Sequence, residues 1–431
     1  MPREKLKVWI VNAQENPPQD RSVPGRRQWR SNTLCERLAD RGHEVIRWRS
    51  SFSHRKKVQL VEKSEKQTTD NYQHQYILSP EYKSHLGFKR ILNHKELGRE
   101  FSRLANSYVH KPDIIHICNV PLELTTACMK FARKNDIATI LDVRDLWPDS
   151  YLNFLPGRLS FLKRPFLYLI QHVLKSTQHH YQQATAVTAI SDKILKWGYK
   201  KARNRDKELD AVFPMANSPG IYVANALAQK EMRQKIGVSE ESVIISYSGN
   251  VGFQTNFEML NEAATILSKE KSNIHFVIAG TGPKYEQLKK ASSNIANIHY
   301  LGWMEGPELR TLLSISDFGV IAFHNVGDYM MSMPNKFVEY LSANLPILCG
   351  TSGQMKELVD DWKCGWNFSV DAGGEALATF LINQFSDEIG VKILRDNAKK
   401  LHSAMFDLDT VLDQMANHLE RVAQLRKSNV K

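Results

Sequence analysis

The stretch from Ser332 to Asn344 constrains the fold of this chain most, because it combines a predicted helix with its start and stop signals. Ser332 is a candidate cap, Pro334 is tolerated only in the first turn of a helix, and good helix formers follow. Asn344 can adopt the left-handed conformation that ends helices. The apolar run 345–348 then predicts a buried strand, so the stretch indicates half of a βαβ unit.

This predicted helix has a polar and an apolar side. We expect the apolar side to carry Phe337, Val338 and Leu341. We expect the polar side to carry Lys336, Glu339 and Tyr340. A lysine beside the free N–H groups of a helix amino end suits a diphosphate, and a carboxylate about 4.5 Å further along the axis suits two ribose hydroxyls. Lys336 and Glu339 also fit an ordinary surface ion pair.

Length and composition indicate a folded protein of two or three domains, since 42% of the 431 residues are hydrophobic. The five cysteines lack C-x-x-C spacing, which argues against a zinc site and a disulfide framework. No apolar run approaches the roughly 18 residues of a membrane-spanning helix. We therefore expect a cytoplasmic protein that is neither exported nor integral to a membrane.

The formal charge of +12 predicts an acidic partner, such as nucleic acid, anionic lipid or a phosphorylated substrate. The basic residues are spread along the chain, and zinc-finger, RNP and phosphate-loop signatures are absent from it, so we expect no nucleic-acid partner. The apolar, aromatic and basic segment 159–175 fits a buried core helix, and it also fits a segment on a membrane surface. The second interpretation would place the protein peripherally on the inner face of the cell membrane.

Alternating strands and helices predict two successive α/β halves. In the first half we expect strands at 7–11, 45–48, 76–78, 113–117, 139–143, 186–190 and 211–213, and helices at 28–41, 94–108 and 122–134. In the second half we expect strands at 243–248, 276–279, 298–301 and 318–322, with a helix from about Asn256. Neither half has G-x-G-x-x-G, so we predict two Rossmann-like domains that face each other across a cleft and bind no dinucleotide.

Charged residues follow two predicted strands of the first half, where open α/β sheets carry their sites. Arg144 and Asp145 follow the strand 139–143, and they could equally pair with each other. Gly25 and Arg26 lie in the loop before the first helix, where the arginine also fits a solvated loop charge. These residues are candidates for a ligand site.

Several short motifs together resemble one family. They are the Pro-x-Lys-x-x-Glu-Tyr-Leu helix at 334–341, Arg-Asp-Leu-Trp-Pro at 144–148, Arg-Gly-His-Glu-Val at 41–45, Tyr-Ser-Gly-Asn at 247–250, Ile-Ala-Gly-Thr-Gly at 278–282, Thr-Ala-Ile-Ser at 188–191 and Cys-Gly-Trp at 364–366. The set resembles the GT-B glycosyltransferases of glycosyltransferase family 4, the group 1 family, and notably its bacterial branch that builds cell-surface polysaccharides. It covers both halves in the right order.

The resemblance implies a donor site for a nucleotide sugar in the second half. Glu339 would hold the ribose, and Lys336 and Asn335 with the helix amides would hold the diphosphate. Gly249 and Asn250 would approach the diphosphate from another loop. Further residues implied near the base are Gly302 and Trp303. Such enzymes use no metal and no cofactor beyond the sugar nucleotide, because the helix dipole and basic groups supply the positive charge.

Two positions depart from the family pattern. The family commonly has a second acid eight residues before the ribose glutamate, where this chain has Met331. The loop after Gly249 commonly carries an arginine and a lysine, where this chain has Asn250 and Gln254. The identity of the donor sugar is therefore poorly constrained.

The resemblance also assigns the parts of the chain. Residues 1–215 would form the acceptor-side domain, 216–392 the nucleotide-sugar domain, and 393–431 a helical tail that packs back on the domains. Arg144 and Asp145 are the catalytic candidates at the acceptor face, with His54 as a further one, and Gly25 and Arg26 belong to the acceptor-side loop.

The expected reaction moves a hexosyl or N-acetylhexosaminyl group from a nucleoside diphosphate to an acceptor hydroxyl, with retention, as the leaving diphosphate takes the acceptor's proton. The acceptor would be a lipid-linked glycan at the membrane surface, in the biosynthesis of O-antigen, capsule or exopolysaccharide. A nucleotide-sugar 2-epimerase of the same architecture is an alternative. Another is a non-catalytic subunit that binds a sugar nucleotide or a glycan.

Overall fold

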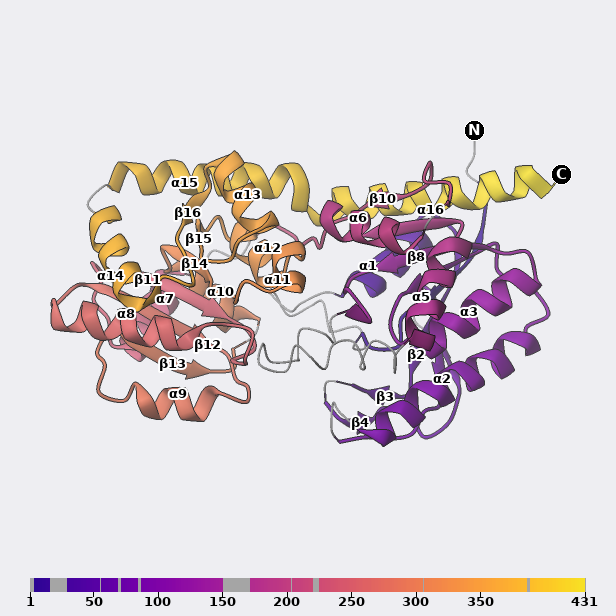
Figure 1. Cartoon of the computed structure of the whole chain (residues 1–431), viewed down its shortest axis with the longest axis horizontal. Helices are drawn as coiled ribbons and strands as arrows, with labels where there is room; N and C mark the ends of the chain where they lie inside the picture. The colour runs from indigo at the N-terminus through magenta and orange to yellow at the C-terminus, as the bar shows by residue number, and fades with distance from the viewer. Residues whose placement is uncertain are drawn as a thin grey trace. The chain divides into compact units, whose positions relative to one another are not determined.

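The computed structural model of the chain divides into two compact units. It describes residues 4–15, 29–54, 56–68, 71–83, 87–149, 171–202, 204–219, 225–304, 306–385 and 388–430. The described residues up to Pro214, together with those from Thr410 onward, form unit 1, and Met215–Asp409 form unit 2. Each unit is an α/β structure with its own sheet (Figure 1).

Unit 1 is built on an eight-stranded sheet in the order β10-β9-β8-β7-β1-β2-β6-β5. Its strands are β1 (Lys7–Val11), β2 (Glu44–Ser50), β5 (Lys66–Thr68), β6 (Gln73–Ile77), β7 (Ile114–Cys118), β8 (Ala138–Val143), β9 (Ala186–Ala189) and β10 (Ala211–Val212). All neighbours pair in parallel except β5, which runs antiparallel to β6. The short apolar runs predicted as strands are buried, as both faces of a parallel sheet require.

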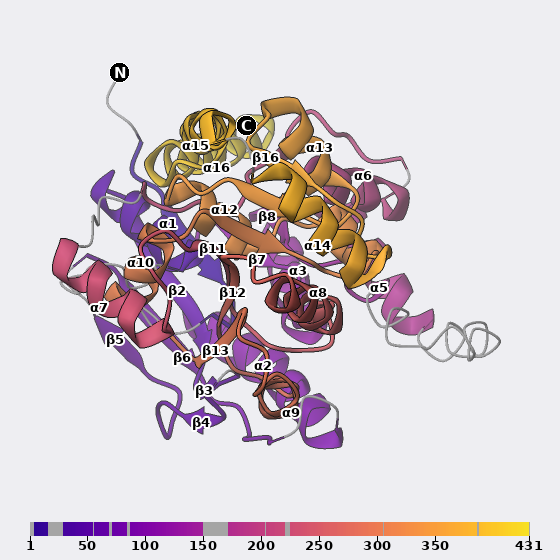
Figure 2. The same cartoon turned by 90° about the vertical axis from the view of Figure 1, so that its left-hand side faces the viewer.

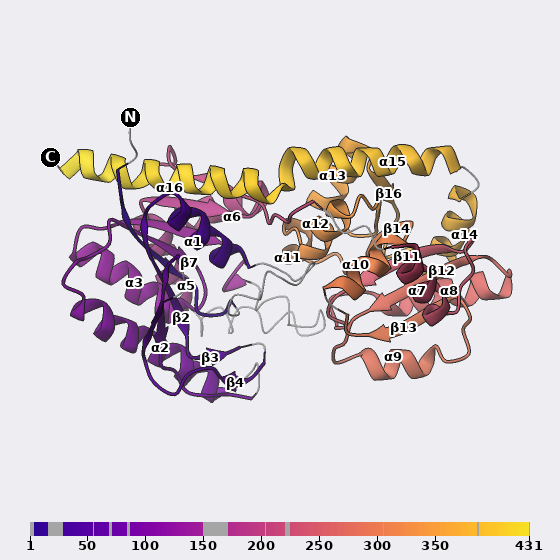
Figure 3. The ribbon, with the colours of Figure 1, turned by 180° about the vertical axis from the view of Figure 1, so that it is seen from behind.

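Helices cover both faces of this sheet. They are α1 (Arg30–Asp40), α2 (Phe88–Ser107), α3 (Leu122–Lys134), α5 (Gln171–Gln183), α6 (Asp192–Lys201) and α16 (Leu408–Val430). A two-stranded hairpin, β3 (Phe52–Ser53) with β4 (Val58–Gln59), follows β2. Helices α2 and α3 lie side by side, as Figure 3 shows from behind. Of the segment 159–175, residues 159–170 lie outside the described residues, and residues 171–175 begin α5.

Unit 2 repeats the plan with a six-stranded parallel sheet in the order β13-β12-β11-β14-β15-β16. Its strands are β11 (Val243–Ser248), β12 (Ile274–Ala279), β13 (Ile298–Gly302), β14 (Phe318–Ile321), β15 (Ile347–Cys349) and β16 (Gly365–Asn367). The order reverses beside β11, because β12 lies on one side of it and β14 on the other. Such a reversal is where open α/β sheets bind ligands.

The helices of unit 2 pack on both faces of its sheet. They are α7 (Ala226–Ile236), α8 (Phe257–Lys269), α9 (Tyr285–Ala291), α10 (Pro307–Ser314), α11 (Gly327–Met331), α12 (Asn335–Ser342), α13 (Gln354–Trp362), α14 (Gly373–Gln384) and α15 (Glu388–Leu401), with a π-helical turn η3 (His402–Phe406). Helices α8 and α14 pack together over a core of Phe257, Leu260, Leu377 and Leu381 (Figure 2). Among the described residues, no helix is long and apolar enough to cross a membrane.

Most predicted elements are confirmed, and the exceptions have physical reasons. The predictions of the strands 7–11 and 243–248 and the helix 122–134 match the structure to the residue. The helix predicted from 94 begins instead at Phe88. The prediction missed the helical i, i+3, i+4 spacing of Phe88, Ile91 and Leu92, which are exposed and so lie outside the buried side of the helix.

Candidate functional site

The carboxyl ends of β11, β12, β13 and β14 meet at one edge of the unit 2 sheet, and the loops that follow them carry most of the predicted donor residues. The loop after β11 contains Gly249 and Asn250, and the one after β13 begins at Gly302. Helix α12 follows β14 by way of the short helix α11. The parallel sheet therefore gathers these loops at the same edge.

Helix α12 differs from the prediction at its start. Ser332 is not its cap, since it ends α11 instead, and Pro334 occupies the cap position with an extended backbone. No side chain of the described residues caps the amino end of α12. Asn344 adopts the predicted left-handed conformation (φ 56°), which confirms the stop signal. The amino end of α12 thus keeps N–H groups and a partial positive charge for a ligand.

Tyr340 was expected on the polar side of α12, but the structure buries it completely. Its hydroxyl accepts a hydrogen bond of 2.8 Å from the N–H of Ser248, the last residue of β11. The ring fits because residue 319 on β14 is a glycine, where a Cβ would lie 2.2 Å from the ring. Tyr340 therefore fixes α12 to the end of β11, one residue before Gly249.

Lys336 places its ammonium in a buried position between two aromatic rings. Its Nζ lies 3.5 Å from the ring centroid of Tyr247 and 5.1 Å from that of Phe323. Among the described residues, this nitrogen has no hydrogen-bond partner. Burial lowers the pKa of Lys336 well below its usual value, and the charge of Glu339 opposes that shift only in part. A buried cation without an acceptor is costly unless a ligand supplies one.

Gly249 brings the loop after β11 close to this ammonium. Its φ of +125° is one that L side chains rarely adopt, and a Cβ there would lie 3.5 Å from the Nζ of Lys336. Gly280 in the next loop supports it, since a Cβ there would lie 1.8 Å from the carbonyl oxygen of Gly249. The structure thus brings Gly249 and Lys336 together from separate elements, as the resemblance implied.

Glu339 lies one turn after Lys336 and is half-buried. Its negative charge raises the pKa of both Lys336 and Arg310, although burial lowers the pKa of each more strongly. Arg310 comes from α10 and is half-buried. No sequence motif marks Arg310, because it lies in an ordinary amphipathic helix, and only the fold brings it near Glu339.

The remaining predicted donor residues lie around the same loops. Asn250 is exposed, its side chain donates to Gln254 at 3.4 Å, and its carbonyl accepts a hydrogen bond of 2.7 Å from the hydroxyl of Tyr247. Gly302 ends β13 with a φ of +81°, and the Trp303 side chain that follows it is 45% exposed. Met331 ends α11 and is half-buried. Asn335 is the first residue of α12.

The corresponding edge of unit 1 holds a buried network of ion pairs. Arg144 donates to Asp142 at 2.7 Å and to Glu15 at 2.8 Å, and both carboxylates are buried. Glu15 in turn accepts hydrogen bonds of 3.0 and 3.1 Å from the N–H of Ser31 at the start of α1. The amino end of α1 is therefore filled by a carboxylate of the chain itself.

A further arginine lies beside each of these two carboxylates. Arg47 lies 3.3 Å from Glu15, and Arg30 lies 3.7 Å from Asp142. Burial raises the pKa of both carboxyls, but the charges of these arginines and of Arg144 outweigh it and hold each pKa below its usual value. Sequence reasoning missed Glu15 and Asp142 as partners of Arg144, because they lie on other elements or point back into the sheet.

The other candidates of unit 1 are placed differently. Asp145 is exposed, whereas Arg144 is bound to Asp142 and Glu15. His54 lies in the β3–β4 hairpin, where its Nδ1 hydrogen-bonds the hydroxyl of Tyr82. Gly25 and Arg26 lie outside the described residues.

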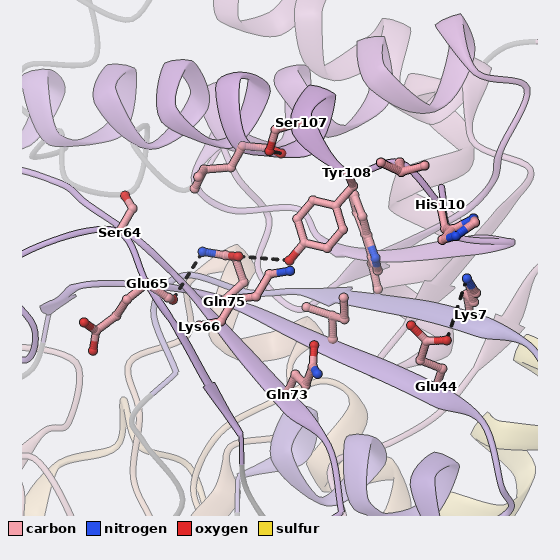
Figure 4. Close-up of a pocket in the computed structure, with 14 residues that line it drawn as sticks. Lys7, Glu44, Ser64, Glu65, Lys66, Gln73, Gln75, Ser107, Tyr108 and His110 are labelled. Atoms are coloured by element: carbon pink, nitrogen blue, oxygen red, sulfur yellow. Dashed lines mark hydrogen bonds and ion pairs between the residues drawn. The ribbon is translucent and has the colours of Figure 1, made fainter.

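Unit 1 also has an open recess of about 470 Å³ at the amino ends of β1 and β2, away from the carboxyl edge (Figure 4). Its polar side chains bond to one another. The hydroxyl of Tyr108 donates to Gln75 at 2.9 Å, Gln75 donates to the Glu65 carbonyl, and Lys7 pairs with Glu44 (Figure 4). These satisfied groups do not indicate a ligand. No cluster of metal-ligating side chains occurs among the described residues either.

Two family models match the chain, one in each unit. The model of Glycosyltransferase Family 4 matches residues 31–204, and the model of Glycosyl transferases group 1 matches residues 228–401. Between them they cover most of the chain.

Solved structures share the fold at low sequence identity. Sucrose-phosphate synthase from Thermosynechococcus elongatus is 12% identical with a TM-score of 0.71, covering 96% of this chain and 98% of that one. HepE from Anabaena, in complex with UDP and glucose, is 13% identical with a TM-score of 0.65, covering 96% and 100%. WaaG, a glycosyltransferase involved in lipopolysaccharide biosynthesis, is 14% identical with a TM-score of 0.59, covering 96% and 99%.

Curated relatives match over shorter stretches. An alpha-D-kanosaminyltransferase of Streptomyces kanamyceticus is 20% identical over 247 residues, which are 56% of this chain and 61% of that protein. An alpha-monoglucosyldiacylglycerol synthase of Streptococcus pneumoniae is 22% identical over 136 residues, 31% of this chain and 30% of that protein. The chain thus matches less than two thirds of the length of either relative. From the two family models and the shared fold, the chain belongs to the GT-B glycosyltransferases of family 4 and group 1.

Proposed function

We propose that the protein transfers a sugar from a nucleoside diphosphate to an acceptor hydroxyl. The observation that carries the proposal is the buried ammonium of Lys336, which lies beside Gly249 at the amino end of α12 and has no hydrogen-bond partner among the described residues. A diphosphate would supply the acceptors that the ammonium and the helix N–H groups lack. HepE, which shares the fold, has been solved with UDP and with UDP-glucose, which supports a ligand of this class.

The roles of the donor residues follow from their positions. Lys336 and the amino end of α12, with Asn335, would stabilise the charge that develops on the leaving diphosphate. Glu339, one turn later, would accept hydrogen bonds from the ribose, and Gly249 would let the backbone approach the phosphates. Since fixed positive groups meet this charge, we propose transfer without a metal ion or a cofactor. Gly302 and Trp303 would lie near the base, and Asn250 near the diphosphate.

We also propose that transfer retains the anomeric configuration and serves the biosynthesis of a bacterial surface polysaccharide. Two curated relatives are named for alpha-linked products, as retention from an alpha-linked donor would give. The role of WaaG in lipopolysaccharide biosynthesis and the glycolipid in the name of the second relative suggest an acceptor carried on a lipid. Asp145 and His54 are the acceptor-side candidates.

A thermal-shift panel of nucleotide sugars tests the donor site. A ligand at one hundred times its dissociation constant stabilises the folded state by about 2.7 kcal/mol, so the true donor should raise the melting temperature of the purified protein clearly. The shift should vanish in Lys336→Met and Glu339→Gln, and it should persist in Lys290→Glu, which alters an exposed lysine of unit 2. The donor site would be disproved if no nucleotide or nucleotide sugar stabilised the protein, or if both site variants kept the shift.

Product analysis separates the transferase from the epimerase and from a non-catalytic subunit. Incubation with the donor and membrane lipid extract should yield free nucleoside diphosphate and a glycosylated lipid, whose anomeric configuration is read by NMR. An altered sugar nucleotide without acceptor would indicate an epimerase instead. Binding without any product would indicate a subunit that only holds the ligand.

A further inference from the structure

Arg310 lies in the first turn of α10, close to the edge of the unit 2 sheet where the donor loops gather. Helix α10 begins soon after the carboxyl end of β13, and α12 follows β14, so the amino ends of both helices lie at this edge. The side chain of Arg310 is half-buried. The acid of the same helix, Glu308, pairs with Lys235 at 2.5 Å. Arg310 therefore places a partly desolvated positive charge at the donor edge.

One apolar cluster holds α10 against α12. Leu313 of α10 is buried in this cluster together with Val338 of α12, and Leu309 packs against it. Arg310 follows Leu309 in the chain, and Glu339 follows Val338. The packing thus fixes the backbones of the two helices directly beside the two charged residues.

The negative charge of Glu339 acts on two cations from different elements. It raises the pKa of Lys336 on α12 and the pKa of Arg310 on α10, although burial lowers both more strongly. The guanidinium of Arg310 lies beyond the 4.0 Å of a direct ion pair with this carboxylate, so the two charges act on each other through space. Charges that are partly withdrawn from water interact over such distances, because water and salt screen them less.

The two cations differ in what they do for the Glu339 carboxylate. Lys336 belongs to the diphosphate end of the proposed site, beside Gly249, and attracts the carboxylate in that direction. A carboxylate that accepts hydrogen bonds from two ribose hydroxyls has to be held in one orientation. Arg310 comes from another helix and supplies a second attraction, which balances that of Lys336.

We propose that Arg310 is a positioning residue of the donor site, whose charge orients the Glu339 carboxylate toward the ribose of the nucleotide. The inference rests on the proposed function, because that function assigns Glu339 to the ribose. In this role Arg310 acts through Glu339 and touches neither the diphosphate nor the transferred sugar. Its contribution is therefore expected in the binding of the donor and not in the chemical step.

Titration calorimetry of the full chain tests this role. The probes are UDP, GDP, ADP and CDP, and for the one that binds most tightly also its counterpart without the two ribose hydroxyls. Arg310→Met should raise the Kd of the nucleotide about tenfold. It should leave the Kd of the counterpart unchanged, because Glu339 then has no hydroxyls to hold. Arg310→Lys should restore most of the affinity, because it keeps the charge.

The matched control is another arginine of unit 2. Arg233 on α7 donates to the carbonyls of Ser239 and Ser242, which precede β11 at the opposite edge of the sheet. Arg233→Met should lower the free energy of unfolding, because it leaves these carbonyls without their donor, and it should leave the Kd of the nucleotide unchanged.

Turnover separates a positioning role from a catalytic one. Arg310→Met should raise KM for the sugar nucleotide about tenfold with kcat unchanged, because the ribose is held equally in the ground state and in the transition state. A loss of kcat at saturating donor would place Arg310 in the chemical step and would overturn the positioning role.

Two binding results would also overturn it. One is an unchanged Kd in both Arg310→Met and Arg310→Gln. The other is an equal loss of affinity for the nucleotide and for its counterpart, which would mean that Arg310 contacts the base or the diphosphate itself. If Glu339→Gln weakens nucleotide binding while Arg310→Met does not, the inference fails alone. If the unchanged protein binds no nucleotide, the proposed function fails with it.

Discussion

Each unit has a buried cation and a helix amino end at the carboxyl edge of its sheet. The two units differ in whether side chains of the protein itself bond to these positive groups. In unit 1, Arg144 is bound to Asp142 and Glu15, and Glu15 also fills the amino end of α1. In unit 2, the ammonium of Lys336 has no hydrogen-bond partner among the described residues, and no described side chain caps α12.

From this difference we infer that the charge of Arg144 is structural, and we propose that the charge of Lys336 serves a ligand. A buried network in which each carboxylate is paired with arginines holds its elements in place. An unpaired buried cation destabilises the protein that carries it, so its presence indicates a ligand that supplies the missing partner. The donor site is therefore argued from a group whose bonding is incomplete.

The distinction between the two cations would be wrong if removing either of them changed the stability of the protein equally. Arg144→Met should lower the free energy of unfolding by up to about 3–5 kcal/mol, because the buried carboxylates of Asp142 and Glu15 both lose their closest cation and keep only Arg30 and Arg47 beside them. Lys336→Met should leave the stability of the ligand-free protein unchanged or raise it, because methionine removes an unpartnered charge at similar volume. Urea unfolding of both variants measures the two effects. Equal destabilisation would mean that Lys336 is also structural.

Removing Lys336, which should not lower the stability of the protein, should instead lower its turnover. Lys336→Met should lower kcat about 100- to 1000-fold, the effect expected when one fixed group that stabilises developing charge is removed. Single-turnover assays with saturating donor, on variant protein shown to be folded by circular dichroism, measure this loss. A kcat near that of the unchanged protein would exclude Lys336 from the diphosphate site.

Removing the hydrogen bond between α12 and β11 should change stability and donor binding less. Tyr340→Phe removes the acceptor for the buried N–H of Ser248 and should lower the free energy of unfolding by about 1–3 kcal/mol, with weaker donor binding. The matched change in unit 1 is Thr188→Val, which removes a 2.9 Å hydrogen bond to Asp142 and should lower stability without affecting donor binding. If Tyr340→Phe left donor binding unchanged, the link would not position the site.

Stability should rise with pH in both units, but over different pH ranges: in unit 1 a stabilising contribution is gained, and in unit 2 a penalty is relieved. The pKa of Asp142 and of Glu15 is lowered in the folded state, so their contribution is present above the unfolded pKa values near 4 and is lost as pH falls. The pKa of Lys336 is also lowered, so the unfolded chain holds a proton that the folded one releases between the two pKa values. The penalty from Lys336 is therefore full below its folded pKa and is relieved as pH rises toward the unfolded value.

Thermal unfolding of the unchanged protein and Lys336→Met across this range measures the effect. The difference between the two melting temperatures should narrow as the pH rises, and a constant difference would contradict the burial of an uncompensated charge. Donor binding should also take up a proton, because a diphosphate raises the pKa of Lys336. Titration calorimetry in buffers of different ionisation enthalpy detects that proton.

The sequence alone determined the class of fold and the elements that carry the donor residues. Short apolar runs and helical periodicity are local patterns, and they predicted strands such as β11 and helices such as α3 to the residue. Spacing along one helix also predicted that Lys336 and Glu339 lie close together, whereas Gly249 was assigned through the family resemblance. Local spacing was enough there, because a helix turn fixes which residues lie near each other.

Only the tertiary structure decided which charges are paired. The sequence suggested that Arg144 could pair with its neighbour Asp145, whereas the fold bonds it to Glu15, which precedes it by more than a hundred residues. In the same way, Tyr340 is buried and Arg310 comes near Glu339 only because separate elements pack together. Burial and electrostatic pairing depend on contacts between distant residues, and a periodic pattern within one element does not contain them.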